Sequence, residues 1–408
     1  MTTVVSTASA ADFLAVVPHL VGFEPQNSVV FVAFRGRRTC GAMRFDLPDP
    51  VGSGADDAGS KLYKRVATTL VGVLSKLPGV DAVVPVVYTG ETFADSGGAP
   101  RAAFARAIIA RFEFSGFELR DALCVAADGW GSYFDDKCPP SGRSLAAIVE
   151  SAILDDVPAS DLPPLGQIER WAALPEATAA QRARVARSVK KFSTAIDGRL
   201  LSSAGVPLAG AGDGEGDVAG DSEGHDVGGH DDGDAPADAP ARLLAEIPPV
   251  LERILDHGAI AIEADAAGFV ITLARLPALR DVVMLQWAFD IDVGDNVLDD
   301  ARRFANGAPP FGLETAGLML GRGPRPNPER IDRAIEVVKG VTALAHRSDR
   351  APLFCILAWL SWALGRSSVA NLFVSAAEEI DDGYGFAQLM RAVLDRGMLP
   401  EWAFASDR

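Results

Sequence analysis

The sequence predicts an α/β region, in which helices pack on a mixed sheet, followed by an all-α region. Three observations lead to this prediction. Apolar strand-like runs alternate with amphipathic helix-like runs between residues 27 and 127. From residue 331 onward the periodicity is helical. Between these regions, residues 211–240 contain ten acidic residues but no Lys, Arg or aromatic residue, the composition of a disordered linker.

The first elements are a helix and a hairpin. Ser9 with Asp12 three residues later forms a capping box, and the helix that follows runs to Leu20 and ends near Gly22. Residues 27–35 and 39–47 read as strands. Because only Gly36, Arg37 and Arg38 separate these runs, we expect them to pair as a hairpin.

The next four elements complete the sheet. We expect a helix over residues 61–77, a strand over 80–88, a helix over 99–114 and a strand over 118–127. The order β-β-α-β-α-β predicts a mixed sheet, because apolar strands separated by helices usually become parallel neighbours that are buried on both faces.

We divide the chain into an α/β domain over residues 1–205, a disordered acidic linker over 206–241 and a mainly helical domain over 242–408. A helix over residues 171–200 is assigned to the first domain. Residues 258–271 fit either a short hairpin or a helix. The remaining predicted helices are residues 241–256, 331–346, 352–364, 367–380 and 385–396.

Charge and composition exclude several classes of protein. The formal net charge of −17 argues against a nucleic-acid partner, since neutralising phosphates requires clustered Lys and Arg. The basic run from Arg182 to Lys191 fits the solvated side of a helix. We expect no membrane span and a cytoplasmic location, because no apolar run reaches about 20 residues and the N-terminus lacks a basic region. The four cysteines form no metal-binding or disulfide pattern, so we expect reduced thiols.

One segment has the residue types of a ligand site. Asp128, Trp130, Ser132 and Tyr133 follow a predicted central strand, and the carboxyl ends of such strands border the ligand crevices of α/β sheets. Tyr88 ends another strand and Arg44 lies on a third, so we expect both near this segment. The alternative is a structural turn with Trp130 buried and Asp128 facing solvent or capping a backbone amide.

No fingerprint for a cofactor or a metal accompanies these residues, and we expect neither. The segment 317–323 lacks the Gly-Lys-Ser/Thr ending of a phosphate-binding loop. Asp290, Asp292 and Asp295 lack the spacing of a calcium loop, and Asp295 or Asn296 is better explained as a helix N-cap. His225 and His230 lie among aspartates without a fixed ligand geometry.

Several blocks of sequence resemble an actinobacterial domain family of unknown function. They are ADFLAVVPHLVGFEPQNSVVFVAFRG, MRFDLP, VYTG, DALCVAADGWGSY, CPP, ALRDVVML and the helical stretch from Ala351 to Met390. Together they span nearly the whole chain apart from the linker. The resemblance implies no catalytic residue, because the family has no established activity.

The C-terminal helices also resemble one unit of a tetratricopeptide repeat. Leu364 and Gly365 are followed by small residues at Ala370 and Ala377, which lets two helices approach closely. We therefore expect Gly365 and Ala370 at a helix crossing. A single unit forms no solenoid, so it reads as one helical hairpin.

Two functions remain open. The first is a non-enzymatic interaction or regulatory protein, whose helical C-terminal face binds a protein partner. The alternative is an enzyme or sensor that binds a small molecule at the strand-end loops. A metabolite retained through purification would favour the second, since an interaction protein has no site for one.

Overall fold

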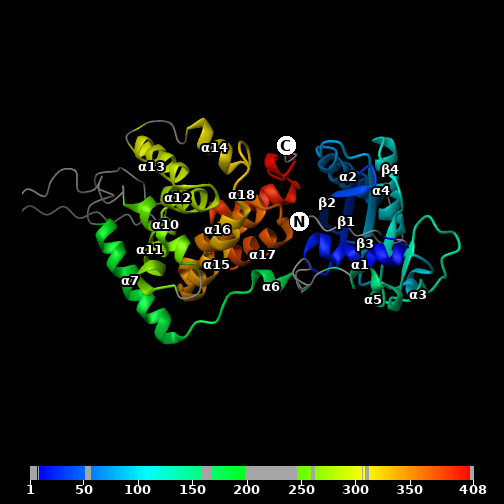
Figure 1. Ribbon diagram of the computed structural model, residues 1–408, viewed down its shortest axis with the longest axis horizontal. Helices are drawn as coiled ribbons and strands as arrows, with labels where there is room; N and C mark the ends of the chain where they lie inside the picture. The colour runs from blue at the N-terminus through cyan, green and yellow to red at the C-terminus, as the bar shows by residue number, and fades with distance from the viewer. Residues whose placement is uncertain are drawn as a thin grey trace, which may run out of the picture. The chain divides into compact units, whose positions relative to one another are not determined.

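The computed structural model describes residues 7, 9–50, 57–155, 157, 165, 168–197, 246–258, 262–305, 307 and 312–404 (Figure 1). The described chain forms two compact units. The first is Met1–Ala173 with Gly365–Leu372 and Arg391–Arg408, and the second is Leu174–Leu364 with Phe373–Met390. The predicted disordered linker, residues 206–241, lies outside the described residues.

The first unit contains a mixed sheet, as predicted. Strands β1 (Ser28–Arg35) and β2 (Arg38–Asp46) form the hairpin, and the sheet order is β2-β1-β3-β5-β6, with β4 also beside β3. The other strands are β3 (Ala82–Tyr88), β4 (Glu118–Leu119), β5 (Leu123–Val125) and β6 (Trp130–Ser132). β3 is antiparallel to β1 and parallel to β4 and β5, whereas β6 is antiparallel to β5.

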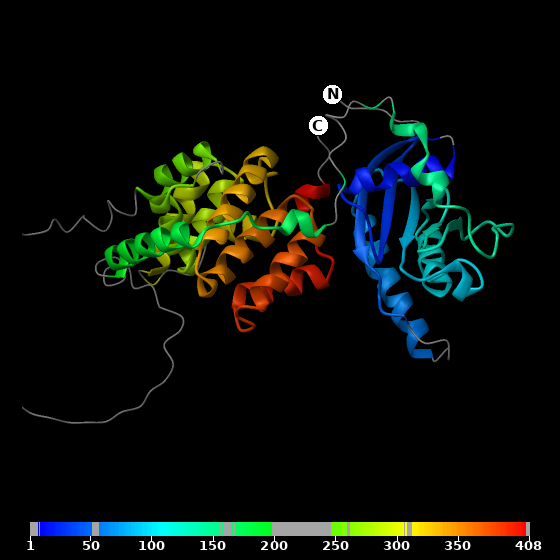
Figure 2. The same ribbon diagram turned by 90° about the horizontal axis from the view of Figure 1, so that it is seen from below.

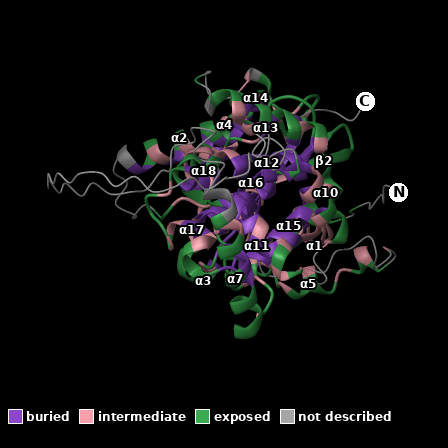
Figure 3. Cartoon of the chain, turned by 90° about the vertical axis from the view of Figure 1, so that its left-hand side faces the viewer, coloured by how far each residue is buried: buried purple, intermediate pink, exposed green. Residues whose placement is uncertain are grey.

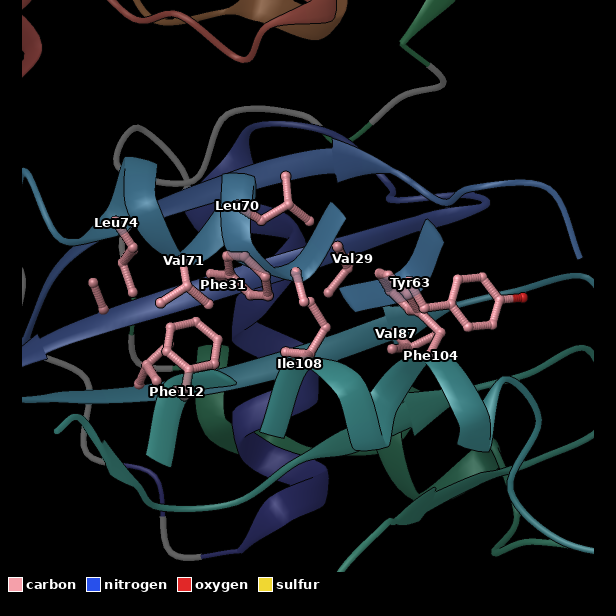
Figure 4. Close-up of a cluster of buried hydrophobic side chains, with 13 residues drawn as sticks. Val29, Phe31, Tyr63, Leu70, Val71, Leu74, Val87, Phe104, Ile108 and Phe112 are labelled. Atoms are coloured by element: carbon pink, nitrogen blue, oxygen red, sulfur yellow. The ribbon is translucent and has the colours of Figure 1, made fainter. Parts of the chain in front are cut away.

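Helices cover both faces of this sheet. As a result, β1 and β3 are buried along almost their whole length. On one face, α2 (Asp57–Leu74) and α4 (Ala102–Phe114) enclose an apolar cluster that includes Phe31, Val87 and Phe112 (Figure 4). On the other face, α1 (Ala10–Val21) buries Leu14 and Val17 against β1 and β3. The capping box of Ser9 and Asp12 begins α1, and Gly22, at φ 83°, ends it.

The strand predicted over residues 118–127 is interrupted, and Pro85 explains the break. The Val83 carbonyl accepts a hydrogen bond from the Arg120 amide, and the Val125 carbonyl accepts one from the Thr89 amide, so the backbone groups of odd-numbered residues in β3 face β4 and β5. Pro85 has no N–H to donate on that side. Pairing stops there, between the partner pairs Val83–Leu119 and Val86–Leu123.

The second unit is helical throughout its described residues, in agreement with the prediction (Figures 1 and 2). Its helices include α10 (Ile247–His257), α11 (Ala264–Ala274), α12 (Pro277–Ala288), α13 (Ile291–Ala305), α14 (Leu313–Met319), α15 (Pro328–Leu344) and α16 (Arg350–Ala363). Every residue of α16 from Ala351 to Ala363 is buried, which makes this helix the centre of the unit (Figure 3). Residues 264–274 are helix, so the hairpin alternative does not hold.

The helix predicted over residues 171–200 differs from the structure in extent and in the unit to which it belongs. It is divided into α6 (Glu169–Ala172) and α7 (Ala179–Asp197), because Pro175 disfavours helical backbone at the residue before it. α7 packs on α11 within the second unit, whereas the division at residue 205 placed it in the first (Figure 1). Its basic side chains are exposed, and Val185 and Val189 are buried.

Two local predictions in the helical sequence were wrong. The N-cap of α13 is Asp290, whose carboxylate accepts a hydrogen bond from the Val293 amide at 2.9 Å, and not Asp295 or Asn296. Gly365 lies between α16 and α17 (Ser367–Glu378) at φ 76°, and a Cβ atom added to it would have no atom within 4 Å. Its role is a left-handed turn and not a helix crossing. Ala370 is fully buried in α17. The last long helix is α18 (Gly385–Asp395).

We predict that Phe112→Ala destabilises the first unit by about 3 to 5 kcal/mol, because its ring is fully buried against Phe31 and Phe117. Hydrogen exchange of the β1 and β3 amides, followed by mass spectrometry, measures this loss locally. Phe114→Ala on the same helix is the matched control, since Phe114 is 80% exposed. Equal effects of the two substitutions would contradict the packing of α4.

Candidate functional site

The predicted site residues are divided between the two ends of the β5–β6 ladder: Tyr88, Asp128 and Trp130 lie at one end, whereas Ser132, paired with Leu123, and Tyr133 lie at the other. Tyr88 is paired in register with Ser28 on β1 and with Val125 on β5, and Val125 is paired with Trp130 on β6. Tyr88 and Trp130 therefore contribute to the apolar cluster on the α1 side of the sheet. Arg44 lies on β2, separated from β3 by β1.

Asp128 holds the loop that follows β3. Its carboxylate accepts hydrogen bonds from the amides of Phe93, at 2.8 Å, and Ala94, at 3.1 Å. These amides begin the short helix α3 (Phe93–Ser96). The bond from Phe93, aided by that from Ala94, lowers the pKa of Asp128 below its usual value. The carboxylate is exposed but engaged with backbone amides, as the structural alternative expects.

Trp130 is part of the core. The residue is 7% exposed and packs in the cluster that contains Val30 and Leu123. The indole Nε1 donates a hydrogen bond to the Ser144 carbonyl at 3.1 Å, and the Arg143 guanidinium lies 5.3 Å from the ring centre. The indole is therefore engaged by its own chain.

Ser132 and Tyr133 have partners within the same loops. The Ser132 hydroxyl donates to Asp121 and accepts from the Phe134 amide. The Tyr133 hydroxyl donates to the Pro100 carbonyl at 2.6 Å, and burial raises the pKa of Tyr133 well above its usual value. Both hydroxyls therefore hold the loops around β6 in place.

Arg44 and Tyr88 differ in how their polar groups are satisfied. The Arg44 guanidinium forms an ion pair with Asp46 at 2.6 Å and donates to the Gln26 carbonyl at 3.1 Å. The Tyr88 hydroxyl is buried, and burial raises its pKa. Within the described part of the chain, neither this hydroxyl nor that of Ser28, its cross-strand partner, has a hydrogen-bond partner. The sequence gives no signal for Ser28.

The second unit has an open groove along α13 and the start of α14. Its volume is about 650 Å³, and it is lined by Asn296, Asp299, Asp300, Arg302, Arg303, Gly312, Glu314 and Thr315. These residues carry no signal in the sequence, because the groove forms only when Gly312 and the start of α14 lie against α13. The Gly312 amide donates to Asp300 at 2.8 Å, which fixes that approach.

The basic side chains that line the groove are paired with aspartates. Arg302 binds Asp299 at 2.9 Å, and Arg303 binds Asp300. Asp300 is 5% exposed. Burial opposes its ionisation, but hydrogen bonds from Thr315, Gly312 and Arg303 outweigh that effect and lower the pKa of Asp300. These paired groups line the groove.

The charge that remains near the groove is negative. Burial, together with the nearby carboxylates of Asp299 and Asp292, raises the pKa of Asp295 on α13. Glu314, an exposed carboxylate, lines the groove at the start of α14. Among the described residues no group of three or more His, Cys, Asp or Glu side chains is arranged to hold a metal ion. The repulsion between these aspartates would be relieved by a positively charged partner.

Comparison with known proteins assigns a family without an activity. A family model described as "Domain of unknown function (DUF4192)" matches residues 11–297 and 315–401. No curated protein and no solved structure matches the chain. Within the described ranges, no helix is both long and apolar enough to cross a membrane.

We predict that Asp128→Ala destabilises the first unit at pH 7 and that the effect disappears in acid. The folded pKa is lowered, so the contribution of Asp128 is present above the unfolded pKa of about 4 and is lost as the pH falls through the folded value. Hydrogen exchange of β5 and α3 between pH 7 and acid measures it. Asp136→Ala, an exposed neighbour, is the control. A loss of stability that does not change with pH would show that the carboxylate is not the cause.

Proposed function

The chain belongs to the DUF4192 family, which brings no known activity, and we propose that it is a non-enzymatic interaction protein. Its helical unit binds a basic segment of a partner protein in the groove along α13 and α14. We propose the cytoplasm as the location of this interaction. The partner is recognised by its Lys and Arg side chains.

The observation that carries the proposal is an open groove beside unbalanced negative charge. Small-molecule sites are usually enclosed and mainly apolar, whereas this groove is lined by charged and polar side chains. An extended polypeptide fits an open, polar surface better. Asp292 and Asp295 on α13, together with Glu314 at the start of α14, supply the attraction for a cationic segment.

Exposed apolar side chains at the C-terminal ends of α13 and α14 are available for contacts that charge alone does not supply. Phe304, in the last turn of α13, is 44% exposed, and Leu320, directly after α14, is 48% exposed. Interfaces gain most of their affinity from such apolar anchors surrounded by polar contacts. A partner segment with basic and apolar residues therefore suits this surface.

The family match also bears on how general the interaction is. It stops at residue 297 and resumes at 315, so Asp299, Asp300, Arg302, Arg303, Gly312 and Glu314 lie outside it. We therefore propose the interaction for this chain and not for its family as a whole.

A second candidate function rests on the sheet. Ser28 and Tyr88 present two buried hydroxyls without partners among the described residues, which supports a small polar ligand or an ordered water at this end of the sheet. The other polar groups there are engaged with the fold, so the groove is favoured.

We predict that a fluorescent arginine-rich peptide binds the full chain more tightly than an acidic peptide of equal length, with an affinity that falls as salt is added. Fluorescence anisotropy measures both. The double variant Asp295→Asn, Glu314→Gln should weaken binding between about 2-fold and 30-fold, since each exposed ion pair contributes about 0.2 to 1 kcal/mol.

The matched control removes two exposed carboxylates elsewhere in the second unit, by Glu336→Gln and Glu379→Gln. It should change the affinity less than the groove variant does. If the control loses as much, net charge and not the groove attracts the peptide. If the acidic peptide binds equally well, the proposal is wrong.

A further inference from the structure

Two cysteines lie in one small cluster of the first unit. Cys124, in β5, is fully buried with Phe93 and Ala126, and Cys138 packs against the same cluster from the turn after β6. Both are free thiols, and Cys138 is partly exposed. With 13 residues between them, they form no recognised cysteine motif, so the sequence alone gives no reason to pair them.

Gly131 makes the approach of the two sulfur atoms feasible. Cys124 is paired in register with Gly131 in the β5–β6 ladder, so the side-chain positions of both residues lie on the same face. A Cβ atom on Gly131 would lie 2.6 Å from Cys138 Sγ. The Cys138 sulfur therefore lies beside the side-chain position directly across from Cys124. Cross-strand positions have Cβ atoms about 4.5 to 5.5 Å apart, so this sulfur is a neighbour of the Cys124 side chain.

We propose that Cys124 and Cys138 are a redox-active pair that forms a disulfide when a hydroperoxide reacts at Cys138. The Cys138 thiolate attacks one peroxide oxygen and releases the other as water after protonation, which leaves a sulfenic acid. The Cys124 sulfur then displaces the hydroxyl group as a second water. Two thiols and one hydrogen peroxide give one disulfide and two waters, so the two electrons that the thiols lose reduce the peroxide.

The different environments of the cysteines assign their order of reaction. An oxidant in solvent reaches the partly exposed Cys138 but not the fully buried Cys124. Burial raises the pKa of the Cys124 thiol to about 12, which also argues against Cys124 as the first thiol to react. The Tyr133 side chain packs against the same cluster. Cys138 is thus attacked first, and Cys124 completes the bond.

Peptide mapping of the full chain tests the pair directly. Trypsin cleaves after Arg120, Lys137 and Arg143, so Cys124 and Cys138 fall in separate peptides, residues 121–137 and 138–143. After brief hydrogen peroxide treatment and alkylation, we expect these peptides joined, two hydrogens lighter than their sum, and separated again by dithiothreitol. Recovery of Cys138 as sulfinic acid while Cys124 is still alkylated would overturn the proposal.

Two variants test whether the disulfide depends on the position of the Cys138 sulfur beside Gly131 or only on the general reactivity of the two thiols. Gly131→Ala places a methyl group against Cys138 Sγ and should lose the joined peptide, whereas Gly41→Ala, with no atom within 4 Å of its Cβ position, should keep it. Formation of the joined peptide in both variants would contradict the assigned geometry. Cys124→Ala serves if Gly131→Ala fails to fold: Cys138 should then proceed to sulfinic acid under the same treatment. A Cys138 that stays an unmodified thiol there would overturn its assignment as the first site of attack.

Discussion

One missing N–H group, that of Pro85, determines how the sheet of the first unit ends. Pro85 lies in β3, whose side chains are buried on both faces, so its neighbours must satisfy the backbone. The side that faces β4 and β5 offers no donor at this position, and the ladder divides there. Between β4 and β5, where the backbone leaves the ladder, the Asp121 carboxylate accepts hydrogen bonds from the Ala122 amide and the Ser132 hydroxyl. β6 then pairs with β5, beyond that break.

This arrangement explains why the strand-end loops have the residue types of a ligand site and yet serve the fold. A short ladder leaves many loop amides to satisfy, and Asp128 and Ser132 accept hydrogen bonds from three of them. Trp130 covers the α1 side of the sheet, and the Cys138 sulfur fills the space beside Gly131 on the opposite face. The helical unit differs, because part of its acidic charge along α13 is left unbalanced. We therefore propose that the partner binds there.

Sequence predicted the elements whose causes are local. The capping box at Ser9, the hairpin turn at Gly36 and the apolar β3 need only neighbouring residues, and all three are confirmed. The break opposite Pro85 depends on which strand lies beside β3, and the hydrogen bond from Trp130 to Ser144 depends on a loop closure. The groove requires Gly312 to reach Asp300. Gly365 shows the same limit, since a small residue suits either a crossing or a left-handed turn, and only the backbone angle separates them.

The most direct test of this account is Trp130→Ala, measured for both stability and binding. If the strand-end segment serves the fold, hydrogen exchange in β5 and β6 should show a loss of about 3 to 5 kcal/mol, the cost of removing a buried tryptophan. The arginine-rich peptide should bind the helical unit of the variant as it binds the parent. Little loss of stability, together with lost peptide binding, would place the functional surface at Trp130 and contradict the account.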